Sequence, residues 1–103
     1  MTALDKIASA LGRRDEVPNQ ELARSLAASG DAQAVAEIAS GLQSADKGVQ
    51  ADCIKVLYEL GYVRPELVSA HTSAFLKLLS SKNNRLVWGG MIALSTVASL
   101  AAE

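Results

Sequence analysis

The side chains that could perform catalysis are few. The chain of 103 residues contains one cysteine, Cys53, and one histidine, His71. Nucleophilic catalysis needs a base within hydrogen-bond reach of the nucleophile, and a zinc site needs several clustered Cys and His ligands. Cys53 falls on an apolar helical stripe and is expected to be a small core residue, while His71 is expected on a helix flank. We therefore predict no catalytic residue, no metal site and no cofactor.

Composition and charge argue against further function classes. Hydrophobic residues make up 50% of the chain and charged residues 20%, which is too apolar for a disordered tail. The formal net charge of −1 gives no electrostatic support for general binding to nucleic acid or to anionic membranes. A single thiol and the absence of a signal-peptide pattern after Met1 indicate a cytoplasmic location. The apolar stretch from Leu86 to Ala102 is short for a membrane span, so a buried helix is favoured.

The elements that position these residues repeat along the chain. Three triplets have the spacing of one helix face, and they recur at offsets of 31 and 37 residues. These triplets are Leu4-Ile7-Leu11, Val35-Ile38-Leu42 and Thr72-Phe75-Leu79. A second set recurs with the same offsets: Pro18, Leu22, Ser25, Leu26 and Ser29; then Val49, Cys53, Val56, Leu57 and Leu60; then Leu86, Gly90, Ala93, Leu94 and Val97. Repetition at this period predicts stacked helical units.

Capping residues divide each unit into two helices. Asp15, Asp46 and Asn83 are expected N-caps of the second helices, and Gly30 and Gly61 are expected to end the first two of these. In the same way, Thr2 and Asp5 form a capping box, Asp31 caps the third helix, and Pro18 and Pro65 stand in first turns. No segment shows strand alternation. The prediction is an all-α chain with six helices near residues 3–13, 16–29, 32–43, 47–60, 65–81 and 84–101.

The stretch from Leu86 to Ala98 resembles the second helix of a HEAT repeat. Residues 49–61 match the same pattern, and residues 18–30 match it more weakly. The resemblance implies a right-handed α-α superhelix, or solenoid, in one domain over residues 1–103, with three HEAT-like hairpins at about 1–30, 31–61 and 62–103. HEAT-like proteins commonly act as scaffolds that bind other macromolecules. The competing tetratricopeptide pattern lacks its recurring Trp, Leu-Gly, Tyr and Pro positions here.

One position departs from the HEAT pattern. The family often has an Arg just after the first apolar residue of the second helix, paired with the turn Asp of a neighbouring repeat. Asn19, Gln50 and Val87 occupy that position in this chain. A complete Asp–Arg ladder is therefore not expected, and capping alone explains the turn acids.

The two ends of the repeat differ in polarity. The first unit is rich in charged residues and is expected to be a solvent-facing cap, whereas no charged residue occurs from Leu86 to Ala102. A helix that is apolar on every side is normally buried on every side. Three interpretations remain open for residues 86–101: further repeats of a longer solenoid pack on them, a second copy covers them in a homodimer, or they bind a partner.

The resemblance also implies a binding surface, because second helices line the concave side of such stacks. The side chains expected on this side and singled out for protein binding are Arg24, Lys55, Tyr58, Trp88 and Ile92. Thr96 is expected on the same ridge, and Lys55 is expected to pair with Asp52 and Glu59 along its helix. The opposing interpretation is that the cations are merely solvated and that Trp88 packs against another repeat.

The function that we predict is a non-catalytic protein–protein interaction scaffold. Some HEAT-like proteins act on DNA bases, so a glycosylase-like activity is an alternative, but acidic residues accompany Arg24 and Lys55 and disfavour nucleic acid. A bilin-lyase-like module that handles a chromophore is a third class, indicated by repeat length alone.

Overall fold

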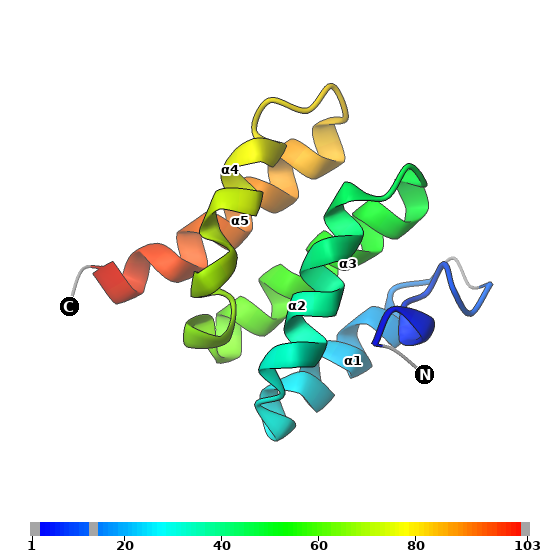
Figure 1. The fold of residues 1–103 in the computed structure, drawn as a ribbon, viewed down its shortest axis with the longest axis horizontal. Coiled ribbons are helices and arrows are strands. Elements are labelled where there is room, and N and C mark those ends of the chain that lie inside the picture. Colours follow the sequence, from blue (N-terminus) through cyan, green and yellow to red (C-terminus); the bar gives the residue numbers. More distant parts are fainter. Residues whose placement is uncertain (1–2, 13–14, 102–103) are drawn as a thin grey trace.

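The computed structural model describes residues 3–12 and 15–101, and this part of the chain is helical with no β-strand (Figure 1). Its α-helices are α1 (Val17–Ser29), α2 (Ala32–Ser40), α3 (Lys47–Val63), α4 (Thr72–Leu78) and α5 (Asn84–Ala101). Its 3₁₀ turns are η1 (Ala3–Lys6), η2 (Gly41–Gln43), η3 (Pro65–Leu67) and η4 (Ser69–His71). The prediction of an all-α chain is confirmed.

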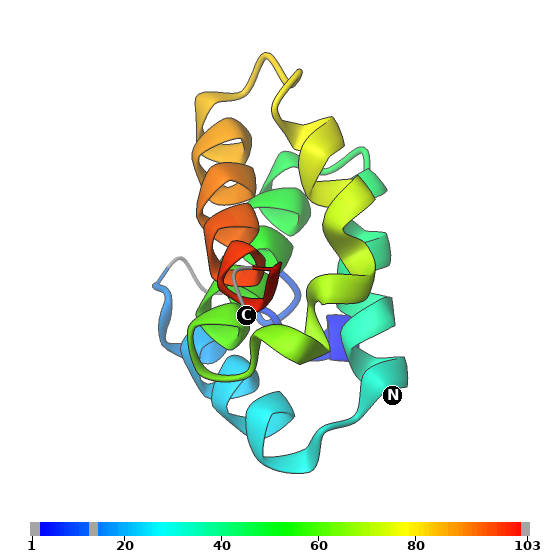
Figure 2. The same ribbon diagram turned by 90° about the vertical axis from the view of Figure 1, so that its left-hand side faces the viewer.

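The helices form two layers. Figure 2 shows α1, α3 and α5 on one side of the molecule, and α2 and α4 on the other. Helix α3 is central, because it packs against α1, α2 and α5, while α4 packs against α5. The chain therefore consists of three consecutive units: η1 with α1, α2 and η2 with α3, and η3, η4 and α4 with α5. We call them the first, second and third units.

Most of the expected helix ends are observed. The Asp31 carboxylate accepts hydrogen bonds from the Gln33 and Ala34 amides, both at 3.1 Å, and begins α2. Asp46 caps α3 in the same way. Asn83 Oδ1 accepts from the Arg85 amide at the start of α5. Gly30 ends α1 with φ of +65°, a left-handed conformation that other residues adopt only with strain.

The first predicted helix does not form an α-helix. Residues 3–6 form a single 3₁₀ turn, and residues 7–12 continue as bends and turns. The physical reason is that side chains of other helices capture the amides that would extend the helix. The Ala8 amide donates to Asn19 Oδ1 at 2.9 Å, and the Ser9 amide donates to Asp52 Oδ2 at 2.7 Å. Thr2, the expected cap, and residue 13, the expected end, lie outside the described residues.

The fifth predicted helix, 65–81, is broken. Two 3₁₀ turns precede α4, which covers only Thr72–Leu78. The Ser69 hydroxyl donates to the Glu66 carbonyl and the Thr72 hydroxyl donates to the Ser69 carbonyl, so side chains compete with the helical ladder in this segment. Val68 lies at the bend between the turns and is fully buried. The prediction of six helices is therefore wrong: the described residues hold five α-helices.

Two predicted helix ends are also wrong. Glu16, and not Asp15, occupies the N-cap position of α1, and its side chain makes no capping hydrogen bond. Gly61 does not end α3, which continues to Val63. Instead, Gly61 allows close approach of α5, because a Cβ at this position would lie 2.9 Å from Thr96 Cβ.

The pair Gly89-Gly90 has a packing role. A Cβ at Gly89 would lie 2.6 Å from Ile54 on α3, whereas a Cβ at Gly90 would lie 3.0 Å from Leu78 and from the Phe75 carbonyl oxygen. Adjacent residues on an α-helix point about 100° apart. The two glycines therefore allow one helix, α5, to approach both α3 and α4 at van der Waals distance.

Candidate functional site

The outward side of the α1–α3–α5 layer carries a row of polar and aromatic side chains on α3. Its members are Lys55, Tyr58, Glu59 and Tyr62, and we call them the α3 row. The opposite side of the helix supplies core residues, including Cys53, Val56, Leu57 and Leu60. With 3.6 residues per turn, burial of that side directs the α3 row away from the core.

Lys55 is held in place by two carboxylates. Its Nζ lies 3.3 Å from Glu16 Oε2 and 2.9 Å from Glu59 Oε1, and 5.0 Å from the centroid of the Tyr58 ring. The side chain is only 15% exposed. Burial acts to lower the pKa of Lys55, but hydrogen bonding to Glu59 and Tyr58 outweighs it, so the pKa lies above its usual range. Lys55 is thus a fixed charge, largely neutralised by its neighbours.

The two tyrosines of the α3 row pack against each other. The ring centroids of Tyr58 and Tyr62 are 6.0 Å apart, and the ring planes are inclined at 74°, an edge-to-face arrangement. Tyr58 is half-buried and Tyr62 is 62% exposed. Sequence reasoning missed Tyr62. The available signal was its position four residues after Tyr58, which places both rings on one helix face.

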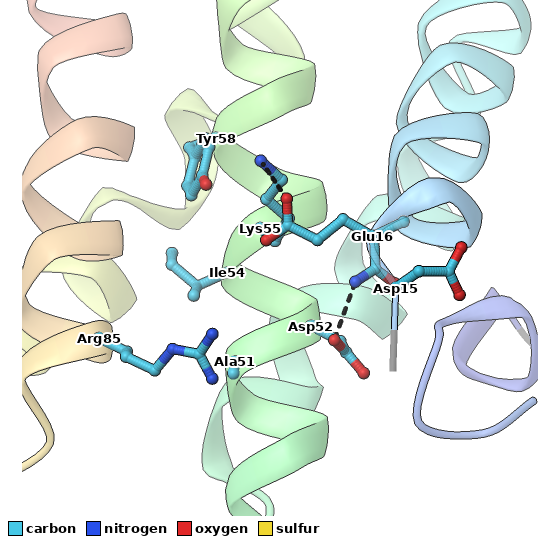
Figure 3. A pocket seen from close by; sticks show the side chains of 9 residues that line it. Asp15, Glu16, Ala51, Asp52, Ile54, Lys55, Tyr58 and Arg85 are labelled. Atoms are coloured by element: carbon cyan, nitrogen blue, oxygen red, sulfur yellow. Dashed lines mark hydrogen bonds and ion pairs between the residues drawn. The ribbon is translucent and has the colours of Figure 1, made fainter. Parts of the chain in front are cut away.

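A charged crevice lies where α1, α3 and α5 meet (Figure 3). Asp15 and Glu16 border it from the start of α1, Asp52 and Lys55 from α3, and Arg85 extends toward it from α5. Its volume is about 150 Å³. This is below the roughly 300 Å³ of typical small-molecule pockets, and its lining is dominated by charged groups. The crevice has the dimensions of a surface feature and not of a substrate pocket.

A hydrogen-bonded network at the floor of this crevice ties the first unit to the second. Asn19, 1% exposed, donates from Nδ2 to Asp52 Oδ1 at 2.8 Å and accepts from the Ala8 amide. The Asp52 Oδ2 atom accepts from the Ser9 amide and also from the Ser9 hydroxyl. The expected helical pair of Asp52 with Lys55 is therefore wrong, whereas the pair of Lys55 with Glu59 is confirmed. Asn19 thus forms a hydrogen bond to a neighbouring unit.

Three of the five predicted binding residues lie close together. Arg24 is exposed on α1 and borders a small depression together with Glu59 and Val63 of α3. Glu59, which pairs with Lys55, thus lies between the depression beside Arg24 and the rest of the α3 row. Lys55 in turn lies over the Tyr58 ring.

The remaining two predicted binding residues lie on α5. Trp88 is 67% exposed, and Ile92 is half-buried. Thr96, which was expected on the same ridge, is 8% exposed and packs against Gly61. The prediction that Thr96 lies on the binding ridge is wrong, because the close approach of α3 and α5 buries that side of the helix.

The candidate chemical groups lie apart from this surface. Cys53 is fully buried, and burial, assisted by the charge of Asp52, raises its pKa to about 12. A neutral buried thiol is a poor nucleophile. His71 is half-buried at the end of η4. Within residues 3–12 and 15–101, no three His, Cys, Asp or Glu side chains are grouped so as to hold a metal ion. No helix in the same ranges is long and apolar enough to cross a membrane.

The candidate binding surface at the α3 row is identified from the geometry of the structure. A comparison of the chain with protein-family models, with curated proteins and with solved structures finds no match.

Proposed function

We propose that this chain is a non-catalytic interaction module, a right-handed superhelix of three HEAT-like hairpins that binds a protein partner through the concave side of the α1–α3–α5 layer. The residues that we assign to binding are Arg24, Lys55, Tyr58, Trp88 and Ile92, and to these we add Tyr62. The observation that carries the proposal is the Tyr58–Tyr62 pair, with one ring largely exposed beside a fixed Lys55.

Several properties of the α3 row support binding of protein. Tyr, Trp and Arg dominate the binding energy of protein interfaces. Tyr58 and Lys55 are already ordered by Tyr62, Glu16 and Glu59, so little side-chain entropy remains to be lost on binding. Because carboxylates neutralise Lys55, the row has no basic excess that would favour nucleic acid.

The absence of catalysis is part of the proposal. The buried, neutral Cys53 thiol gives it support, as does the small volume of the charged crevice. A cytoplasmic location also remains a prediction, and the single cysteine is its basis. DNA-base chemistry and chromophore handling remain alternatives from the HEAT-like resemblance, and no feature of the described residues favours either.

The proposal is tested by site-specific photo-crosslinking. The photoreactive amino acid benzoylphenylalanine replaces Tyr62 in one variant and Ala36, which is exposed on α2 in the other layer, in a matched variant. We expect a crosslinked partner from the Tyr62 position and none from the Ala36 position. Equal crosslinking at both positions would contradict the assignment of the binding face.

Calorimetry with the purified crosslinked partner then measures the contribution of single residues. Tyr62→Ala is expected to weaken binding by about 30-fold, the effect of an interface hot spot. Lys47→Ala, at an exposed lysine of the same helix away from the α3 row, is the control and should leave affinity unchanged. Unchanged affinity after Tyr62→Ala, Lys55→Ala and Arg24→Ala would overturn the proposal.

A further inference from the structure

The charges of the chain are divided between its two ends. From Leu67 to Ala101 the sequence contains Lys77, Lys82 and Arg85 and no Asp or Glu. Residues 1–40 carry six acids and four cations; the acids are Asp5, Asp15, Glu16, Glu21, Asp31 and Glu37, and the cations are Lys6, Arg13, Arg14 and Arg24. The third unit is therefore basic from Leu67 onward, whereas the residues up to the end of α2 have a small acidic excess, although the net charge of the chain is only −1.

The acidic end contains a groove. Because η1 is a single turn, it covers only part of α1, and cavities of about 420 and 470 Å³ lie beside it. Lys6, Leu22 and Ser25 line both cavities, so the two form one groove. Its wall includes Leu11, 52% exposed. The four carboxylates at its rim and walls are those of Asp5, Glu21, Asp31 and Glu37, against one lysine. We call this surface the acidic groove.

The basic end presents apolar side chains to solvent. On α4, Ala74 packs toward the core, whereas Leu76, on the other flank, is 53% exposed, and Leu79, the residue that follows α4, is 40% exposed. On α5, Gly89 faces α3 and Gly90 faces α4, so the side away from both helices carries Trp88 and Met91. Met91 is 53% exposed. We call Leu76, Leu79, Trp88 and Met91 the apolar end face.

The two ends differ in charge and both expose apolar side chains. The third unit is net positive from Leu67 onward, and the exposed Lys77 follows Leu76 on α4, while the acidic groove has an apolar floor and a carboxylate rim. We propose that the acidic groove binds the apolar end face of a second copy of this chain, so that the chains associate head to tail. The acidic groove contains none of the residues that we assign to partner binding, and the apolar end face shares only Trp88 with them; the proposal does not depend on the partner-binding function.

The association repeats a contact that already exists inside the chain. The second unit packs on the first through α1 and α3, and the third packs on the second through α3 and α5. A second copy whose first unit packs on the third unit continues the same stack. An interface between two different surfaces of one chain does not close by itself, so the expected products are dimers, trimers and longer species. Charge attraction between the ends predicts weaker association at higher salt.

Two variants that each block one end test the proposal. Leu79→Glu places an acid on the apolar end face, and Ser25→Trp fills the acidic groove; both positions are exposed, so both variants are expected to fold. Sedimentation equilibrium should show a mass that rises continuously with concentration for the wild type. Each variant alone should be a monomer, with association weakened at least about tenfold. An equimolar mixture of the two should form a dimer and nothing larger, since one intact interface remains.

Matched controls add the same side chains elsewhere. Ser73→Glu adds an acid to α4, and Ala28→Trp adds an indole to α1, at exposed positions outside both surfaces. Both should associate as the wild type does, and circular dichroism should show that all four variants keep their helices. A wild type that is monomeric at every concentration would overturn the proposal. So would a mixture that stays monomeric, or a Ser25→Trp variant that dimerises alone, because that result indicates pairing of two apolar end faces.

Discussion

The first and third units contact the central helix α3 in different ways. The first unit makes polar contacts with it, because Asp52 accepts hydrogen bonds from the Asn19 side chain at 2.8 Å and from the Ser9 amide at 2.7 Å. The third unit is fixed by close packing of helices, because Gly89 leaves space for the Ile54 side chain and Gly61 leaves space for the Thr96 side chain. The polar contacts constrain a segment that does not form an α-helix. The close packing at the glycines brings two long helices together.

This difference predicts how each unit responds to change. Hydrogen bonds from a few side chains are directional, so loss of one acceptor leaves buried donors without partners. Close packing of helices is sensitive to added volume, because interiors have little free space. Removal of a hydrogen-bond acceptor should therefore destabilise mainly the first unit, and added side-chain volume should destabilise mainly the packing of the third unit.

Added volume at Gly89 should have the largest effect. A β-branched side chain at this position would collide with Ile54, whose nearest atoms lie close to the backbone and cannot move away easily. We expect Gly89→Val to lower the free energy of unfolding by about 3 kcal/mol, at the upper end of overpacking effects. Urea denaturation measures this change. Ser95→Val, at an exposed position of α5, is the control and should change stability by less than about 0.5 kcal/mol.

Removal of the Asn19 amide should have the next largest effect, and it should be local. Asn19→Ala leaves the Ala8 amide and one Asp52 oxygen without their partner, and we expect a loss of about 2 kcal/mol. Hydrogen exchange should accelerate at the Ala8 and Ser9 amides, while the amides of α5 keep their relative protection. If the amides of α5 lose protection as much as those of the first unit, the two units are not held independently.

The second unit contacts both of the other units. Ionisation of its Cys53 thiol should have a smaller effect on the free energy of unfolding, and this effect depends on pH. The pKa of Cys53 rises from 9.0 to about 12 on folding, because the thiol is buried and lies near Asp52. Its contribution is fully present below pH 9 and decreases as the pH rises toward 12, since the unfolded thiol releases its proton first. We expect a loss of about 1 kcal/mol at pH 10.

Unfolding by urea between neutral pH and pH 10 measures this loss in the wild type and in Cys53→Ala. The variant should be less stable at neutral pH because it leaves a cavity, but its stability should depend less on pH above 9. The same alkaline slope in both proteins would show that Cys53 is not responsible.

Much of the fold follows from local signals in the sequence. Asp31, Asp46, Asn83 and Gly30 act at the expected helix ends, because capping depends on the nearest three or four residues. Helical periodicity likewise identifies the buried triplet Val35, Ile38 and Leu42 in full. The candidate site is anticipated in part: Lys55 and Glu59 pair as their spacing predicts, and Arg24 lies beside them.

Other features depend on residues distant in the sequence. The segment after η1 is not an α-helix because Asn19 and Asp52 compete for its amides, and nothing near residues 7–12 indicates this. Thr96 is buried because Gly61, 35 positions earlier, has no side chain and leaves space for it. The apolar periodicity also fits a complete first helix, so it could not reveal the groove beside η1.

The sequence by itself determined that the chain is all-α, where most of its α-helices begin, and which faces of α2 and α3 form the core. These properties arise from interactions within one or two helical turns and from the apolar period. The tertiary structure decided how closely the helices approach, which polar groups cross between units, and which surfaces stay open to a partner. Such properties depend on the shapes of two surfaces brought together, and the spacing within either one does not specify them.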